Sequence, residues 1–188
     1  IPQPIHRGER ITSPEALTFV EMAAYEAASK IVTGLAGMGI QALIGNWVRA
    51  KSRGVIDGVD YQFTGNVERV DIGTLSHLLD EGYIPILPPI GWNPSGKSYN
   101  LPADELAYST AMALTSEKLF FVGTHGVLRS GEHKLPDAVK TVSDGRISRL
   151  TVQEARELEH SGVVNVVWRR LISFGRRACE AGVNRVHI

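Results

Sequence analysis

The spacing of hydrophobic positions predicts several helices in this chain. Residues 13–35 carry apolar side chains at helical spacing, with Ser13 as the expected cap and Pro14 at the first helical position. The glycine-rich stretch at residues 34–39 is expected to end this helix. The same spacing, with caps and glycine stops, predicts further helices over residues 72–81, 104–115 and 166–181, and one that begins after Thr151 with the capping-box pattern T-V-Q-E.

Short apolar runs between these helices predict strands. Residues 83–90 (YIPILPPI) and 118–124 (KLFFVGT) are each typical of one buried strand, and residues 183–188 of an unfinished one. A β-hairpin is expected with its turn at Asp57-Gly58 or at Thr64-Gly65. Because strands alternate with crossover helices, the pattern favours an α/β domain with a mainly parallel sheet.

Composition narrows the class of protein without identifying it. The 188 residues suffice for one domain, and 43% hydrophobic with 21% charged residues is ordinary for a soluble protein. Twenty basic residues balance twenty acidic ones, so nothing in the net charge favours nucleic acid or an anionic membrane as partner. The lone Cys179 excludes an internal disulfide and a cysteine-based zinc cluster, which suits a cytoplasmic protein.

The ends of the chain suggest a fragment. It starts at Ile1 rather than at methionine, and its last residues read as an incomplete strand. The first ten residues lack a signal-peptide core, and no apolar run approaches the roughly 18 residues that span a bilayer. We therefore expect residues 1–188 to be a single domain that is incomplete at both ends, with no membrane partner.

Residues 91–98 (GWNPSGKS) spell the phosphate-binding pattern G-x-x-x-x-G-K-[ST]. A phosphate loop must turn from its lysine directly into a helix. Here Pro102 would fall in the second turn of that helix, at a cost of about 3 kcal/mol. We therefore interpret Asn-Pro-Ser-Gly as a plain turn between strand-like segments, with the helix starting near Pro102 and Lys97 exposed.

Residues 96–104 (GKSYNLPAD) instead resemble the G-x-x-Y-N-x-x-A-D signature of the amino acid kinase family. Further segments resemble the same family in the same order, namely GERITSPEALTFVEM, TGNVERVDIGTLSHLLDEGYIPILPPIG, TSEKLFFVGTHGVL and ACEAGVNRVHI. Together they span nearly the whole chain. The resemblance implies a three-layer αβα sandwich with a mainly parallel sheet.

Within the family, GVIDGVDYQFTGNVERVD and WRRLISFGRRACEAGV are similar to the N-acetylglutamate synthase branch. The acetylglutamate kinases carry Thr-Asp where this chain has Gly123-Thr124, and a lysine-bearing segment where it reads VNVVWRRL without lysine. Pro102 also replaces the second asparagine of the kinase motif. Phosphoryl transfer needs lysines and metal to neutralise charge, so we expect poor phosphotransferase chemistry.

The resemblance therefore implies the amino-acid-kinase-like domain of an amino-acid N-acetyltransferase, which makes N-acetylglutamate from acetyl-CoA and glutamate in arginine biosynthesis. This domain would bind arginine as a feedback inhibitor and build a cytoplasmic homo-oligomer, with no cofactor of its own. The acetyltransferase domain that uses acetyl-CoA is absent from these residues, so the fragment alone is expected to be inactive. Two alternatives stay open: an acetylglutamate kinase that uses ATP and Mg to phosphorylate N-acetylglutamate, and a regulatory or assembly module without chemistry.

Three residues are candidates for ligand binding, and no catalytic residue is assigned. Arg10, at the family's arginine position, could clamp a carboxylate, or be a solvated loop residue. Asn100 could hydrogen-bond a ligand, or serve as a cap or turn. Asp104 organises lysines in the kinases that this chain resembles, but here the first turn of a helix favours its carboxylate for structural reasons.

The remaining polar residues are assigned plainer roles. Cys179 is expected to be a small core residue, and no metal is expected because the histidines lack ligand spacing. The histidines are His6, His77, His125, His133, His160 and His187. A basic cluster is expected to be solvated or to face another subunit, with an anionic ligand such as CoA as a minor alternative; it comprises Arg169, Arg170, Arg176 and Arg177.

Overall fold

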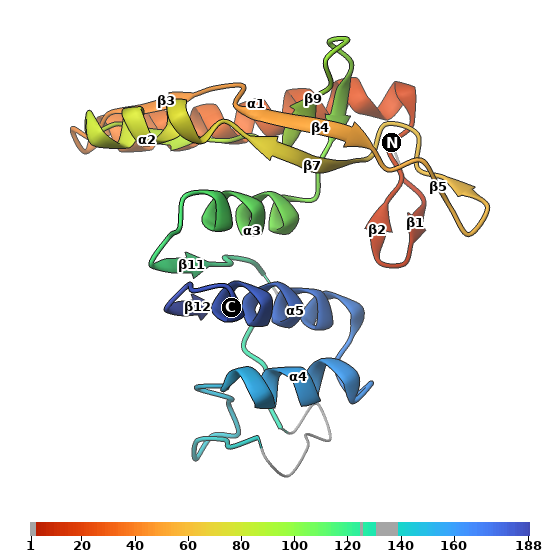
Figure 1. Ribbon diagram of the computed structural model, residues 1–188, viewed down its shortest axis with the longest axis vertical. Helices are drawn as coiled ribbons and strands as arrows, with labels where there is room; N and C mark the ends of the chain where they lie inside the picture. The colour runs from red at the N-terminus through yellow and green to blue at the C-terminus, as the bar shows by residue number, and fades with distance from the viewer. Residues whose placement is uncertain (1–2, 125, 131–138) are drawn as a thin grey trace. The chain divides into compact units, whose positions relative to one another are not determined.

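The computed structural model describes residues 3–124, 126–130 and 139–188. The chain divides into two compact units, Ile1–Leu114 and Thr115–Ile188. Figure 1 shows the elements of each unit in sequence colours. Among the described residues, no helix has both the length and the apolar character that crossing a membrane requires.

The helices of the first unit begin where their capping residues predict. α1 (Pro14–Gly37) starts after Ser13, whose hydroxyl accepts a hydrogen bond from the N–H of Ala16. α2 (Ile72–Asp80) is capped by Asp71, and α3 (Ala103–Ala113) begins directly after Pro102. The predicted helix boundaries are therefore confirmed to within a few residues.

Four strands form the main sheet of the first unit, in the order β10 (Ser98–Asn100), β9 (Ile90–Trp92), β4 (Val48–Ser52), β7 (Gly65–Val70). β4 runs parallel to β9 but antiparallel to β7, and β9 and β10 form an antiparallel hairpin. A separate parallel pair joins β3 (Ala42–Ile44) and β8 (Ile84–Ile86). Parallel strands and hairpins thus occur together in this unit.

The prediction of one strand over residues 83–90 is wrong. The segment forms two strands, β8 and the start of β9, which belong to different sheets. Pro88 and Pro89 lie between them, and proline has no N–H to donate to a strand ladder. The chain therefore leaves one sheet at the prolines and enters the other.

Two short hairpins complete the first unit. β1 (Ile5–His6) pairs with β2 (Glu9–Arg10), and β5 (Val55–Ile56) pairs with β6 (Val59–Asp60). The second hairpin turns at Asp57 and Gly58, whose φ values of 52° and 77° suit a two-residue turn that matches strand twist. Of the two turns that the sequence allows, the one at Asp57-Gly58 is confirmed.

A hydrophobic core cluster of the first unit draws its members from β4, β10, the residue after β10, and α3. Its buried members are Val48, Ala50, Tyr99, Leu101 and Leu106. Gly91 of β9 lies so close to this cluster that an added Cβ would stand 2.7 Å from the Cβ of Ala50 and 2.8 Å from Cδ1 of Leu101. Only glycine fits at this position without a shift of its neighbours.

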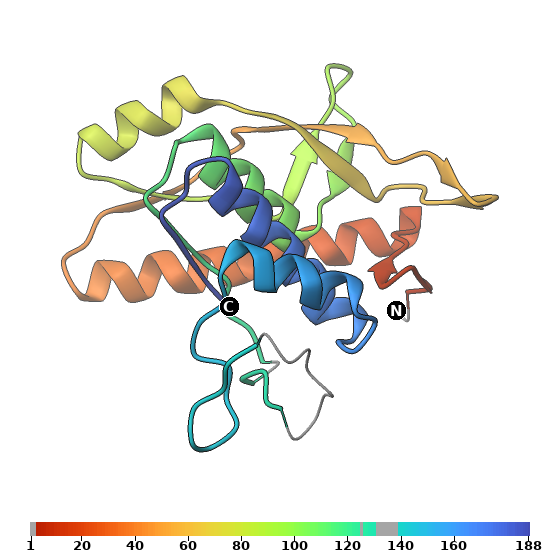
Figure 2. The ribbon, with the colours of Figure 1, turned by 60° about the horizontal axis from the view of Figure 1, so that its bottom comes forward.

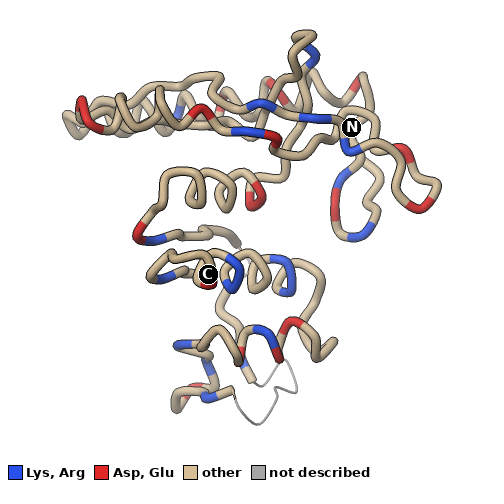
Figure 3. The backbone as a smooth tube through the Cα atoms, in the orientation of Figure 1, with Lys and Arg blue, Asp and Glu red and all other residues tan. Residues whose placement is uncertain are grey.

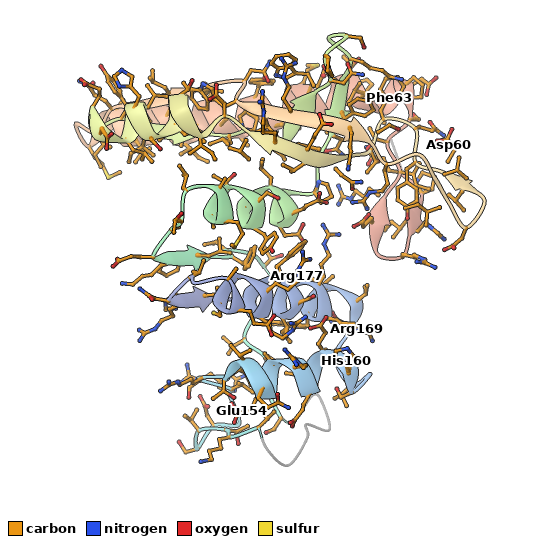
Figure 4. The ribbon with its side chains drawn as sticks, viewed as in Figure 1. Asp60, Phe63, Glu154, His160, Arg169 and Arg177 are labelled. Atoms are coloured by element: carbon orange, nitrogen blue, oxygen red, sulfur yellow. The ribbon has the colours of Figure 1, made fainter. Side chains whose placement is uncertain are left out.

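In the described residues of the second unit, two strands accompany two helices. β11 (Lys118–Phe120) runs parallel to β12 (Arg185–His187), and α4 (Val152–His160) packs on α5 (Val166–Glu180), as Figure 2 shows. The capping box predicted for α4 is present, with Thr151 and Glu154 exchanging hydrogen bonds at its N-terminus. Glu154 lies at the first turn of α4 and His160 at its end (Figure 4).

The prediction of a buried strand over residues 118–124 is only partly right. The strand ends at Phe120, and only Leu119 of β11 is buried. Phe120 is 58% exposed and Val122 is 95% exposed. Among the described residues β11 pairs with β12 alone, and a strand with one neighbour is not enclosed as a central parallel strand is.

Candidate functional site

A chain of hydrogen bonds joins two of the three candidate residues in the first unit. The side-chain amide Nδ2 of Asn100 donates to Oγ1 of Thr12 at 2.8 Å. The hydroxyls of Thr12 and Thr64 lie 3.2 Å apart, and the hydroxyl of Thr64 donates to the backbone carbonyl of Arg10 at 2.9 Å. Asn100 on β10 and Arg10 on β2 are therefore connected through two threonines, and we call these four residues the threonine bridge.

The direction of each bond in the threonine bridge follows from counting hydrogens. A hydroxyl carries one hydrogen, and Thr64 uses its hydrogen on the carbonyl of Arg10. The hydrogen between the two hydroxyls must then come from Thr12, so Oγ1 of Thr64 accepts it together with the backbone N–H of Thr12 at 2.9 Å. Thr12 and Thr64 are 0% and 2% exposed, so water cannot replace these bonds.

Each candidate residue has a distinct setting. Arg10 is exposed on β2, whereas Asn100 is partly buried at the end of β10. Asp104 lies in the first turn of α3, where its Oδ1 accepts from the N–H of Glu105 at 2.9 Å. Such a position stabilises a carboxylate through the helix dipole. A ligand-binding role for each of these residues stays a prediction.

A second group, which the sequence did not single out, surrounds Arg53. This guanidinium pairs with Glu9 of β2 and with Glu105 of α3, whose Oε2 lies 3.1 Å from its Nη2. Its Nε donates to Oδ1 of Asn66 in β7 at 2.7 Å. The ring centroid of Tyr61 lies 5.5 Å away. We call Arg53, Glu9, Glu105 and Asn66 the Arg53 cluster.

The sequence offers only weak signals for these two groups. Thr12 and Thr64 both lie within the quoted family segments, but 52 residues separate them, so their pairing requires the fold. Arg53 sits in a polar exit from β4, a setting typical of a solvated side chain. Its burial depends on two carboxylates that come from elements on either side of it in sequence.

The segment that spells a phosphate loop forms the turn of the β9–β10 hairpin. Oδ1 of Asn93 accepts from the backbone N–H groups of Ser95 and Lys97, at 3.1 and 2.9 Å. A phosphate loop would direct such amides at its ligand. Lys97 is exposed, with its Nζ 4.4 Å from the ring centroid of Phe63. The interpretation of this stretch as a plain turn is confirmed.

A cavity is lined by described residues in each unit. In the first unit, a space of about 330 Å³ is lined by Glu21 and Tyr25 of α1 and by Trp92 and Ser98 of the β9–β10 hairpin. In the second unit, a cavity of about 230 Å³ lies beside Trp168, Ile172 and Cys179 of α5. Burial raises the pKa of the Cys179 thiol, so this cysteine is a poor nucleophile and fits the predicted structural role.

The basic cluster of α5 differs in part from expectation. Arg176 is not a solvated side chain, because it is 14% exposed and its Nε contacts Glu159 of α4 at 2.9 Å. It also pairs with Glu180 at 2.7 Å, and hydrogen bonding to Glu159 is the main reason that its pKa is raised. The guanidinium of Arg170 lies 5.9 Å from the ring of Phe174. Arg169 and Arg177 are labelled on the same helix in Figure 4.

Three of the histidines, His6, His160 and His187, have side-chain contacts within the described residues. Nδ1 of His6 lies 2.8 Å from the hydroxyl of Tyr61, and His187 stacks on Phe120 at 4.3 Å. His125 and His133 lie outside the described residues. Over residues 3–124, 126–130 and 139–188, no group of three histidine, cysteine, aspartate or glutamate side chains is arranged to hold a metal ion.

The fold and the sequence together define the class of protein. Residues 7–188 match the model of the amino acid kinase family, and the chain belongs to that family. The carbamate kinase of Giardia, at 10% identity and a TM-score of 0.61, shares the fold and confirms the predicted α/β class.

More similar relatives belong to one branch. The chain is 32% identical to the amino-acid acetyltransferase of Salmonella typhimurium and 35% identical to that of Pseudomonas putida, over 97% of its own length in both cases. The N-acetylglutamate synthase of Neisseria gonorrhoeae, solved with coenzyme A and N-acetyl-glutamate, is 32% identical with a TM-score of 0.84. A second structure of that synthase, with coenzyme A and L-arginine, is 31% identical with a TM-score of 0.82.

These matches cover 97–100% of this chain but only part of each relative. The chain spans 42% of both curated acetyltransferases, and 41% and 42% of the two solved synthase chains. The predicted resemblance to the amino acid kinase domain of N-acetylglutamate synthases is confirmed. The activity of the longer relatives lies beyond what this part of the sequence establishes.

Proposed function

We propose that this chain is the amino-acid-kinase-like domain of an N-acetylglutamate synthase. In the complete enzyme, the amino group of glutamate would take the acetyl group from the thioester of acetyl-CoA and release coenzyme A. That reaction would occur in a separate acetyltransferase domain, and this domain alone would be inactive. The protein would serve arginine biosynthesis in the cytoplasm.

The start of α5 carries the proposal. Residues 164–171 (VNVVWRRL) lie near the segment that holds a lysine in the kinases this chain resembles, and no lysine is present here. Asn165 instead caps α5 by accepting hydrogen bonds from Val167 and Trp168, both at 3.0 Å. Trp168 is 7% exposed and packs in the core of the second unit. The start of the segment thus serves packing and capping, and the segment offers no lysine to a transferring phosphoryl group.

The role that we assign to this domain is ligand binding and assembly. The exposed guanidinium of Arg10 suits a ligand carboxylate, and the threonine bridge connects its backbone to Asn100. Arginine as a feedback inhibitor is the ligand that we propose, with N-acetylglutamate or glutamate as the related small molecule. We further propose a homo-oligomer that requires neither nucleic acid nor a membrane, and no cofactor held by this domain.

Two assays and one titration test the proposal. The complete protein is assayed with acetyl-CoA plus glutamate and, separately, with ATP and Mg plus N-acetylglutamate. We expect N-acetylglutamate and free coenzyme A in the first assay and no ADP in the second. Formation of ADP without acetyl transfer would establish the kinase alternative. Calorimetric titration of the 188-residue chain with L-arginine should show saturable binding that Arg10→Ala weakens, and no heat of binding would sink the regulatory role.

A further inference from the structure

The Arg53 cluster meets the proposed ligand site at two places. Glu9 directly precedes Arg10 on β2, and Glu105 directly follows Asp104 in the first turn of α3. Arg53 pairs with both carboxylates at once. We infer that Arg53 is a positioning residue, which fixes β2 and the start of α3 relative to each other and thereby sets the geometry of the ligand site. This inference rests on the proposed ligand-binding function.

The contacts of Arg53 cover three elements of the first unit. Its guanidinium reaches β2 through Glu9, α3 through Glu105 and β7 through Asn66. Glu105 is held from its other side as well, because its Oε1 accepts the backbone N–H of Val67 in β7 at 3.0 Å. One guanidinium, itself bonded to β7, therefore holds both carboxylates, and Glu105 is also bonded to β7 directly.

The side chains of the Arg53 cluster are largely buried, so their ion pairs are less weakened by water than surface pairs are. The Arg53 side chain is 10% exposed, that of Glu9 is 17% exposed and that of Glu105 is 19% exposed. A planar guanidinium with several donors can hold two carboxylates and an amide oxygen in fixed directions. A lysine ammonium has the same charge but lacks this planar fork. Substitution by lysine should therefore keep the charge and lose the geometry.

The chain offers a matched control at the tips of its two short hairpins. Arg7 of the β1–β2 turn pairs with Asp57 of the β5–β6 turn, but these side chains are 65% and 50% exposed. The basic and acidic residues of the β1–β2 hairpin are visible in Figure 3. An exposed pair of this kind contributes little, so Arg7→Gln should leave the ligand site unchanged.

The experiment compares Arg53→Lys, Glu105→Gln and Arg7→Gln with the unchanged chain. Glutamine at position 105 keeps a carbonyl oxygen for the N–H of Val67 but loses the charge that Arg53 holds. Amide hydrogen exchange is measured over residues 5–12 and 100–106, without ligand. L-arginine and N-acetyl-L-glutamate are then titrated by calorimetry, at a temperature where circular dichroism shows every variant folded.

For Arg53→Lys we expect faster exchange in both segments together, and a loss of ligand affinity of about 10- to 100-fold. Glu105→Gln should show the same joint change, and Arg7→Gln neither effect. Exchange that rises in only one segment, or affinity that Arg53→Lys leaves unchanged, would overturn the inference. If the unchanged chain binds neither ligand, the proposed function fails, whereas the exchange data still decide whether Arg53 holds the two segments together.

Discussion

The hydroxyl of Thr64 holds the backbone carbonyl of Arg10 at 2.9 Å, across 54 residues of sequence. This bond attaches the N-terminal hairpin to the start of β7 at the position of a candidate ligand residue. It makes no use of the Arg10 side chain, so the guanidinium is presented by a backbone that is fixed independently. The contribution of this bond can be measured as a change in the free energy of unfolding.

Thr64→Val should destabilise the chain by about 1–3 kcal/mol, because the buried N–H of Thr12 and the carbonyl of Arg10 both lose their partner. Valine has nearly the same shape, so packing is kept. Urea unfolding followed by circular dichroism gives the free energy. Thr64→Ser is the matched control, since it retains the hydroxyl, and a valine variant as stable as the serine variant would contradict the threonine bridge.

Gly91→Ala should destabilise the first unit by about 1–3 kcal/mol, because the new Cβ would press on Ala50 and Leu101. The comparison is Gly34→Ala, which adds the same methyl group in the interior of α1. Apart from the nearby backbone of the helix itself, no atom lies within 4 Å of this added Cβ. That change should stabilise the chain by about 0.5–1 kcal/mol through helix propensity. Thermal or urea unfolding of both variants measures the difference, and equal effects would refute the close approach.

The contact between α4 and α5 should depend on pH through Glu159. Burial by itself would raise the pKa of this carboxyl, but hydrogen bonds from Arg176 and Ser173 outweigh it and hold the pKa below its ordinary value. Because the folded pKa is depressed, the stabilisation is present above the ordinary glutamate range and is lost as pH falls through the folded value. Unfolding free energy measured from pH 7 down to pH 3 should fall less steeply for Glu159→Gln. Parallel curves would exclude Glu159 as a source of the acid sensitivity.

Cys179 should react slowly with iodoacetamide in the folded chain. Burial raises the pKa of its thiol, so little thiolate is present at pH 8, and access is restricted as well. Mass spectrometry of timed samples follows the alkylation, and the same chain in guanidinium chloride is the control that should react fast. Equal rates in the two conditions would place the thiol at the surface.

Interactions between residues that are near in sequence allow the helix starts and one hairpin turn to be predicted. Ser13 and Thr151 mark helix starts because their hydroxyls serve neighbours within three residues, and Pro102 fixes the start of α3 for a similarly local reason. The Asp57-Gly58 turn is chosen by its backbone angles. The predictions that were wrong concern which strands pair, such as the single strand expected over residues 83–90. Strand pairing depends on segments that are distant in sequence.

In the candidate site, too, some residues can be predicted from the local sequence and others depend on distant contacts. Arg10 and Asn100 could be selected because they match positions of a known family's sequence pattern. Thr12, Thr64 and Arg53 could not be selected, because their roles come from contacts with residues that are distant in sequence, up to 54 positions away. The burial of Arg176 differs from the prediction for the same reason, since its partner Glu159 lies on another helix.

The donor and acceptor roles of the two hydroxyls in the threonine bridge determine how the side-chain amide of Asn100 is oriented. Because Thr12 gives its hydroxyl hydrogen to Thr64, its oxygen can only accept, and Asn100 must present its NH₂ group there. The carbonyl oxygen of the same amide is thereby directed away from Thr12. A ligand that meets this oxygen must bring a hydrogen-bond donor, such as an ammonium or guanidinium group, whereas a carboxylate would be repelled. The polarity of the amino acid that suits this position is thus set by two buried hydroxyls that the ligand itself need not touch.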